Sequence, residues 1–532
     1  MNNVGLILQA HLPYVRHPEY PRFLEEDWLF EAISETYLPL LRMLKKLREE
    51  SVPYSITISL SPTLCAMLSD PVLQGKFTNY LNLHKELAEK EIERCKIESP
   101  ESLDVADMYL RRIELNIRDH FETYQCNILA GFADLESSGH LELITTAATH
   151  AYLPLYCEYP EAVNVQIALA VQSHINHFKK RPKGFWLPEC GYFPGLESYL
   201  QHEEIGYFQV AAQSFLLSQD EVKRGNYAPV SCPNGVHAFA RDFNLTSLVW
   251  SNQEGYPADP DYREFYRDIG YDLPIDYIGP YIHEPEVRVF TGFKYYAITG
   301  KSDDKRYYRP DKAAIKVAQH ADNFLYNIQK KGKDLSKVLD IDPYYTVAFD
   351  AELFGHWWFE GIDWLEAVIR RIAATGDVTL KTPSEYLVEE NELQTLQPAL
   401  SSWGEGGYSR VWADGDNLWI YRHVHKALER MTELANRFSG QNSLKQRFLN
   451  QAAREVLLAM ASDWPFIIHN KTAVGYAEKR LRNHLANFNL VYENMCKNAV
   501  NTEWLVKAEK RNNLFSDIDY NMFGSGRLEE HS

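Results

Sequence analysis

Residues 4–18 read VGLILQAHLPYVRHP, an apolar run that ends abruptly in a polar segment with two prolines and two histidines. A short apolar run followed by such a segment predicts a buried strand that opens into a functional loop. The same order recurs at 55–60 (SITISL), 141–145 (LELIT), 184–187 (GFWL) and 346–349 (TVAF). Long amphipathic stretches at 73–96 and 109–127 lie between such runs and predict helices.

Strand, polar tip and helix in repeated order are typical of a parallel α/β barrel, in which the carboxyl ends of the strands meet at one rim. His11, His150, Glu189 and Asp350 each lie directly after such a run or a few residues beyond it. We therefore expect these four side chains to converge at one end of a barrel.

Two segments break the barrel pattern. From 226 to 285 turns, prolines and aromatic residues predominate, which predicts an inserted subdomain beside the site. Beyond about residue 420, apolar residues such as Val424, Leu428 and Met431 recur every three or four positions, which predicts helices. The expected domains are a catalytic barrel over 1–225 and 286–395, an insertion over 226–285 and a mainly helical C-terminal domain over 396–532.

The composition indicates a folded, acidic protein. The chain has 532 residues, a net charge of −18 and 45% hydrophobic residues, enough for more than one domain. An acidic body repels phosphate backbones and anionic membranes, so we expect no nucleic-acid or membrane partner. The N-terminus lacks a signal-peptide pattern and no apolar run approaches a membrane span, so we expect a cytoplasmic protein. The seven cysteines are widely spaced, which predicts reduced thiols.

Two carboxylates lie in apolar and aromatic surroundings. Glu189 is part of GFWLPECGY and Asp350 of VAFDAELFGHWW. Apolar surroundings raise the pKa of a carboxyl group, and two carboxyls in different environments can divide into an acid and a nucleophile. Strand-end caps or salt-bridged acids are the structural alternative for both residues.

His11 and His150 fit three interpretations: metal ligands, groups that hydrogen-bond a substrate, or core histidines. Deacetylases and mannosidases that use zinc or manganese need closely spaced ligands such as HxH or HxD. His11 and His17 are separated by five residues and form no such cluster. The sequence therefore favours a site without a metal, and no cofactor is expected.

Aromatic residues make up 13% of the chain, and many lie in polar or glycine-rich stretches. Sugar rings stack on such aromatic faces, although most aromatic side chains fill cores. Trp403 lies in SSWGEGGY, and Trp412 follows this glycine-rich segment closely. Because glycine offers little for a ring to pack against, we expect Trp403 and Trp412 to form a stacking platform.

Six motifs together resemble those of glycoside hydrolase family 57, with the greatest similarity to its 1,4-α-glucan branching enzymes. They are, in order, HLPYVRHP, GHLELITTAATHAYLPL, GFWLPECGY, VAFDAELFGHWWFEG, SSWGEGGY and SDWPFIIHNKTAVGYAEKR. The last begins at Ser462, so the resemblance covers nearly the whole chain. It implies an incomplete (β/α)7 barrel and retention of the α configuration at the reacting sugar carbon.

The resemblance also implies roles for individual residues. It makes Glu189 the nucleophile and Asp350 the general acid/base, without a metal. It places His11 and His150 against the donor sugar. It further places substrate-binding side chains along the glucan cleft, namely Trp186, Tyr271, Trp403, Trp412 and Asp463.

Three functions are compatible with these motifs. The leading one is a retaining branching transglycosylase that cleaves α-1,4 links and transfers the chain to a 6-hydroxyl group. The second is an α-amylase-type hydrolase that uses the same two carboxylates. The third is a non-catalytic glucan-binding protein, which the presence of both carboxylates argues against. The expected partner is an amylose-like or glycogen-like glucan, and a monomer is compatible with the sequence.

One loop bears on the ratio of transfer to hydrolysis. Residues 227–235 (YAPVSCPNG) carry proline and glycine, as a loop able to close over the cleft would. Branching members of the resembled family tend to carry a tyrosine there, and Ser231 takes that place in this chain. The sequence thus predicts weak branching and more hydrolysis, unless Tyr227 serves as the lid aromatic.

Overall fold

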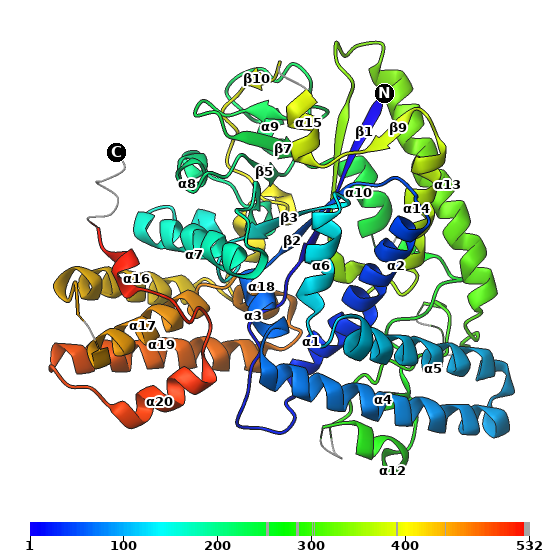
Figure 1. The fold of residues 1–532 in the computed structure, drawn as a ribbon, viewed down its shortest axis with the longest axis horizontal. Coiled ribbons are helices and arrows are strands. Elements are labelled where there is room, and N and C mark those ends of the chain that lie inside the picture. The colour runs from blue at the N-terminus through cyan, green and yellow to red at the C-terminus, as the bar shows by residue number, and fades with distance from the viewer. Residues whose placement is uncertain are drawn as a thin grey trace.

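The computed structural model describes residues 1–251, 255–283, 287–300, 302, 304–389, 392–441 and 443–525. Its centre is a curled sheet of seven parallel strands, which the chain enters at its first residues (Figure 1). In spatial order these strands are β7 (His237–Ala240), β5 (Tyr207–Val210), β4 (Gly184–Trp186), β3 (Leu141–Thr146), β2 (Ile56–Leu60), β1 (Asn2–Ala10) and β8 (Tyr344–Asp350).

A bridge between Arg241 and Thr346 joins the two ends of this sheet, just after β7 and within β8. The seven strands therefore curl round into a (β/α)7 barrel, as predicted. Three short strands extend the sheet: β9 (Val378–Leu380) pairs with the start of β1, while β6 (Val230–Ser231) and β10 (Gln394–Thr395) lie beyond β7.

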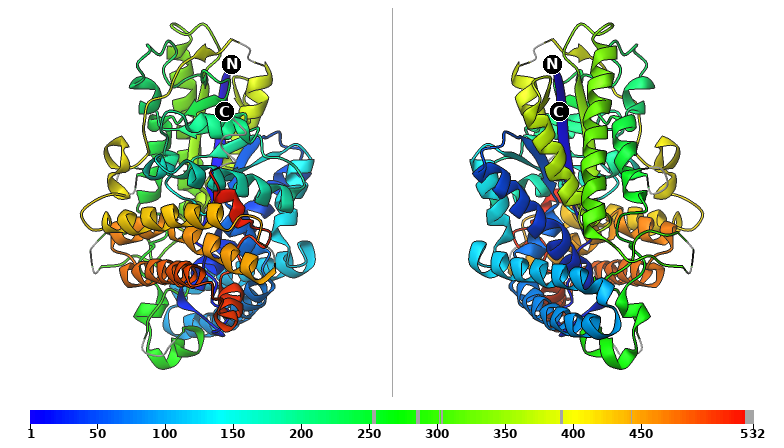
Figure 2. Two further views of the ribbon diagram at one scale, coloured as in Figure 1. Left: turned by 90° about the vertical axis from the view of Figure 1, so that its left-hand side faces the viewer. Right: turned by 90° about the vertical axis from the view of Figure 1, so that its right-hand side faces the viewer.

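Helices fill the connections between the strands. Between β1 and β3 they are α1 (Asp27–Ala32), α2 (Leu38–Glu49), α3 (Pro62–Leu68), α4 (Pro71–Glu98), α5 (Leu103–Arg118) and α6 (Ile128–Ser137). The later connections contain α7 (Pro160–Phe178), α8 (Leu196–His202), α9 (Gln213–Leu216), α10 (Phe243–Trp250), α13 (Pro310–Leu335), α14 (Gly361–Ala374) and α15 (Pro383–Glu389). In Figure 2 the long helix α13 runs alongside β1.

The barrel interior is filled by side chains rather than open. Trp186, Tyr207, Phe239 and Tyr344 form one buried cluster there, each at most 1% exposed. This arrangement corrects the expectation that Trp186 lines the glucan cleft. Its side chain points inward from β4 and is fully buried, because inward residues of a small barrel must fill the interior.

The insertion begins later than expected. His237–Ala240 pairs with β5 as a barrel strand and α10 follows it, so the start at residue 226 is wrong. The described part of the excursion lies between α10 and α13 and contains the short helices α11 (Ile269–Asp272) and α12 (Ile275–Ile278). The strand was missed because it has four residues and follows a proline- and glycine-containing hairpin.

The loop at 227–235 does not lie over the carboxylates. Ser231 pairs with His237, and His237 and Gly184 both pair with Tyr207, so these residues mark the amino ends of neighbouring strands. The Tyr227 carbonyl accepts a hydrogen bond from the amide of Tyr344, the first residue of β8. The loop therefore lies at the edge of the barrel opposite Asp350. The expectation that Ser231 or Tyr227 occupies a lid over the cleft is wrong.

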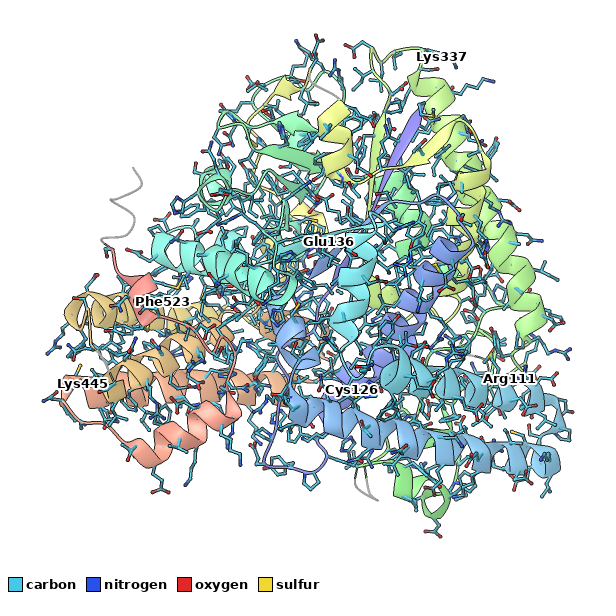
Figure 3. The ribbon with its side chains drawn as sticks, in the orientation of Figure 1. Arg111, Cys126, Glu136, Lys337, Lys445 and Phe523 are labelled. Atoms are coloured by element: carbon cyan, nitrogen blue, oxygen red, sulfur yellow. The ribbon has the colours of Figure 1, made fainter. Side chains whose placement is uncertain are left out.

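The C-terminal domain is helical, as predicted. It contains α16 (Trp419–Arg437), α17 (Ser443–Ala459), α18 (Asp463–Asn470), α19 (Val474–Cys496) and α20 (Thr502–Arg511). Their apolar faces join those of α7 and α8 in one buried cluster, so the domain packs directly on the barrel. Lys445 of this domain and Arg111 on α5 mark opposite ends of the molecule in Figure 3. No helix in the described segments is long and apolar enough to cross a membrane.

Candidate active site

Glu189 stands at the carboxyl end of β4 on a turn that redirects the chain. Pro188 precedes it, and Glu189 and Cys190 have φ angles of 61° and 50°. Side chains other than glycine rarely occupy this left-handed region, and such strain gathers at functional sites. The turn brings the Glu189 carboxyl group to the barrel rim, where its side chain is 12% exposed.

Two hydrogen-bond donors hold the Glu189 carboxyl group. Trp403 Nε1 donates to Oε2 over 2.9 Å, and Ser462 Oγ donates to Oε1 over 3.0 Å. The Trp403 amide also donates to the Glu189 carbonyl over 3.0 Å. Burial raises the pKa of Glu189 above its usual range, and the two side-chain hydrogen bonds limit this rise. The donors thus favour the ionised form of a buried carboxyl group.

Asp350 is the last residue of β8, and its carboxyl group has a different environment. Burial raises the pKa of Asp350 well above its usual range, and the negative charges of Glu352 and Glu189 raise it further. The Arg241 guanidinium opposes them by lowering the Asp350 pKa. No hydrogen bond from another described residue reaches the Asp350 carboxyl group, so nothing comparable to the Glu189 donors stabilises its charge. This site can supply one carboxylate and one proton donor.

His11 and His150 are brought together, as expected from their strand ends. Their rings stack with centroids 3.8 Å apart and an interplanar angle of 12°. His11 Nδ1 lies 2.9 Å from Ser61 Oγ, and its Nε2 lies 3.1 Å from Asp463 Oδ1. His150, at φ 54°, has Nδ1 3.9 Å from Glu189 Oε1. Both histidines therefore border the carboxylate.

Ser462 fixes the tautomer of His150. Its hydroxyl has one proton, which goes to Glu189, so the hydroxyl must accept from His150 Nδ1–H over 2.9 Å. His150 Nε2 then carries no proton, and it has no partner among the described residues. Burial and the neighbouring charge of His11 lower the pKa of His150, which keeps the ring neutral.

The helical domain supplies part of the site. Ala151 and Ala461 form a bridge, and the Ser462 amide donates to the His150 carbonyl over 3.0 Å. These contacts dock the start of α18, with Ser462 and Asp463, against the barrel rim. The structure thus places Asp463 against His11, whereas sequence reasoning missed Ser462. The only signal for Ser462 was its position directly before Asp463 in the last motif.

A π-helical segment, Ile33–Tyr37, holds the loop that follows Asp350. The Tyr37 hydroxyl donates to Glu352, whose Oε1 also accepts the His11 amide over 3.2 Å. Glu35 pairs with His356 in the same loop. Burial raises the pKa of Glu352 to about 7. Sequence reasoning assigned no role to Tyr37 or Glu352, although Glu352 lies two residues beyond Asp350 in the quoted motif.

Arg241 is a further site residue that the sequence did not reveal. Its Nε donates to the Ala348 carbonyl over 3.1 Å, two residues before Asp350 on β8. Its guanidinium carbon lies 5.0 Å from the ring centroid of Trp403 and 5.7 Å from that of Trp250. Arg241 was hidden because its segment was assigned to the insertion.

The aromatic candidates separate into different environments. Trp403 is partly exposed and touches Glu189, whereas Trp412 is 1% exposed and stacks on Tyr152 at 4.5 Å. A Cβ atom at Gly404 would lie 2.6 Å from the Trp412 ring, so glycine lets the backbone cover that ring. The expectation that Trp412 offers an open stacking face is therefore wrong. Tyr271 is 47% exposed on α11, where its ring contacts Phe290 of the excursion.

No group of three or more His, Cys, Asp and Glu side chains suited to a metal ion occurs within the described segments. The two histidines at the rim stack face to face, and Ser61 and Ser462 engage their Nδ1 atoms. The metal-free site stays a prediction.

Comparisons with known proteins agree with this geometry. The family model described as glycosyl hydrolase family 57 matches residues 5–397, and the model described as 1,4-alpha-glucan branching enzyme, C-terminal, matches residues 423–523. A 1,4-alpha-glucan branching enzyme of Thermococcus kodakarensis is 31% identical, over 96% of this chain and 77% of its own length.

Two solved structures share the whole architecture. The alpha-amylase AmyC from Thermotoga maritima is 42% identical with a TM-score of 0.92, over 98% of this chain and 99% of its own. A branching enzyme of the same family from Pyrococcus horikoshii is 29% identical with a TM-score of 0.88, over 98% and 97%. With the family model covering the entire barrel and relatives aligned along nearly the full chain, the protein belongs to glycoside hydrolase family 57.

Proposed function

We propose that the protein is a retaining α-glucan transglycosylase of the 1,4-α-glucan branching enzyme type. The observation that carries this proposal is the unequal pair of buried carboxyl groups at one barrel rim. Two donors stabilise the charge of Glu189, while burial and neighbouring negative charges raise the pKa of Asp350 well above its usual range and so favour its protonated form. Retaining glycosidases need one nucleophilic carboxylate and one acid of raised pKa on either side of the scissile bond.

In the first step the Glu189 carboxylate attacks C1 of the donor sugar. The glycosidic C1–O bond breaks as Asp350 gives its proton to the leaving oxygen, and a glycosyl ester forms on Glu189. In the second step the Asp350 carboxylate takes the proton from the 6-hydroxyl of a second chain. That oxygen bonds to C1, the ester bond breaks, and an α-1,6 branch results. His11 and His150 lie at the same rim, where their ring nitrogens can hydrogen-bond the donor sugar.

Hydrolysis of the amylase type is the second candidate, and two observations favour it. The chain is 42% identical to an alpha-amylase over almost its entire length. The loop with Ser231 lies at the barrel edge opposite the carboxylates, so it places no aromatic lid between the ester and water. In this version water replaces the 6-hydroxyl in the second step.

Product analysis on amylose tests both candidates. Branching lowers the iodine colour, releases few reducing ends and creates chains that isoamylase sets free. Hydrolysis creates one reducing end for each bond cleaved and no isoamylase-sensitive link. Glu189→Gln and Asp350→Asn keep side-chain size and should abolish both outcomes while glucan binding persists. Near-normal turnover by Glu189→Gln would contradict the proposed nucleophile, and a glucan unchanged by the unmodified protein would reject an enzymatic role.

A further inference from the structure

A pocket of about 350 Å³ opens beside Trp403, on the side of Glu189 away from the histidine pair. Its walls come from the segment after β5, from the start of α10 and from the glycine-rich segment after Trp403. The residues that matter here are Gln213, Leu217, Arg241, Phe243, Trp403 and Tyr408. Leu217, Phe243 and Tyr408 are 57%, 71% and 48% exposed, an unusual grouping of large apolar side chains around one hollow.

The walls of this pocket are held in place. Gln213 Nε2 donates to the Ser402 carbonyl over 2.6 Å, which ties the segment after β5 to the glycine-rich segment. A Cβ atom at Gly407 would lie 2.6 Å from Gln213 Nε2, so this close approach needs glycine, and Gly407 also has φ 83°. Phe243 begins α10, whose first turn is capped by the Asp242 carboxylate accepting the Leu245 amide over 3.0 Å.

The position of the pocket relative to the carboxyl groups decides what it can hold. Glu189 Oε1 faces Ser462 and the histidine pair, whereas Oε2 faces Trp403, which lines the pocket. Arg241 also lines the pocket and is anchored to the β8 backbone two residues before Asp350. The proton donor of a retaining glycosidase stands beside the leaving oxygen, so a pocket on this side receives the leaving part of the chain.

We infer that this pocket binds the glucosyl units on the reducing-end side of the scissile bond, with Phe243 and Leu217 as their apolar supports. Aromatic and aliphatic faces suit the apolar faces of glucosyl rings, and Arg241 and Gln213 bring polar groups to the same walls. The same pocket would hold the leaving chain and then the acceptor. This inference rests on the proposed function, because it presupposes cleavage of an α-glucan.

The test uses maltooligosaccharides labelled at the reducing end, analysed at low conversion so that each labelled fragment reports one cleavage. The fragment that carries the label is the part bound on the leaving side. Removing a side chain that supports glucosyl units on the leaving side weakens those binding modes in which the substrate extends far enough to contact it. Phe243→Ala and Leu217→Ala should therefore shorten the labelled fragments, with the ratio between neighbouring cleavage positions changing about three- to tenfold, as expected for lost ring contacts.

Leu216→Ala is the matched control. Leu216 is 59% exposed and adjacent to Leu217, yet it does not line the pocket. It should leave the cleavage pattern unchanged, and melting temperatures of all three variants should match the unmodified protein because the replaced side chains are mostly exposed.

Longer labelled fragments from Phe243→Ala would overturn the inference by assigning the pocket to the donor side. An unchanged pattern in both Phe243→Ala and Leu217→Ala would overturn it equally, while leaving the proposed function intact. Failure of the unmodified protein to cleave either the labelled oligosaccharides or amylose would instead reject the proposed function, and the inference with it.

Discussion

Replacing Trp403 by Phe isolates the hydrogen bond to Glu189 from the packing of the ring. Trp403 Nε1 donates to Glu189 Oε2 over 2.9 Å, and phenylalanine keeps an aromatic ring without that donor. The nucleophile must be ionised, and the donor lowers the pKa of Glu189 against the effect of burial. Its loss therefore raises the Glu189 pKa and moves the acidic limb of the activity profile to higher pH.

The size of this shift follows from the strength of the bond. A hydrogen bond to a charged group contributes about 1.5 to 3 kcal/mol, and one pKa unit corresponds to about 1.4 kcal/mol. The acidic limb of kcat/KM should thus move upward by about one to two pH units. The basic limb belongs to the acid form of Asp350 and should stay in place, so the bell-shaped profile narrows from its acidic side.

The assay is kcat/KM for glucan cleavage across the pH range, with two companion variants. Ser462→Ala removes the second donor to Glu189 and should shift the same limb in the same direction. Trp412→Phe is the control, because Trp412 Nε1 is buried without a described partner and its loss removes no bond to the carboxylate. If Trp403→Phe lowered kcat/KM by the same factor at every pH, the reasoning would be refuted. Trp403 would then act only as a substrate contact.

Three further outcomes are expected. Glu352→Gln removes a negative charge that raises the pKa of Asp350, so the basic limb of kcat/KM should move to lower pH by about one to two units, the scale of a nearby charge at an effective dielectric of about 20. Ser231→Tyr should leave the ratio of isoamylase-released chains to reducing ends unchanged; a rise in that ratio would restore the loop as a lid. Trp412→Ala should destabilise the fold by about 3 to 5 kcal/mol, seen in thermal melts, whereas Trp357→Ala, at 57% exposure, should change stability little.

Much of the barrel and its rim was predictable because strand ends leave a local pattern. An apolar run that stops at a polar tip is visible at Glu189 and Asp350, and the geometry of parallel strands then brings such tips together. The pairing of His11 with His150 followed from the same argument. Local sequence thus identified the residues whose position depends on one strand alone.

The missed features depend on contacts between distant segments. Ser462 reaches Glu189 across 273 positions, and no local pattern marks a serine at the start of a helix as a donor to a barrel carboxylate. The burial of Trp412 cannot be predicted from the glycines near it, because glycine is compatible both with an open loop and with a backbone packed against a ring. Here Gly404 instead allows the backbone to lie against the ring. The sequence likewise does not indicate at which edge of the barrel the hairpin before β7 lies, since its residues are compatible with either edge.

These contacts indicate which segments of the chain can influence the ratio of transfer to hydrolysis. The hairpin at 227–235 lies at the amino edge of the barrel, so it cannot shield a glycosyl ester that forms on Glu189 at the carboxyl edge. The segments that do border Glu189 are the turn with Trp403 and the start of α18 with Ser462, and the pocket continues from Trp403 to Phe243. An acceptor chain competes with water only if it occupies that pocket while the ester exists. If the pocket binds the acceptor, its walls set the ratio of transfer to hydrolysis. Substitutions at Phe243 should then change that ratio, whereas substitutions at Ser231 should not.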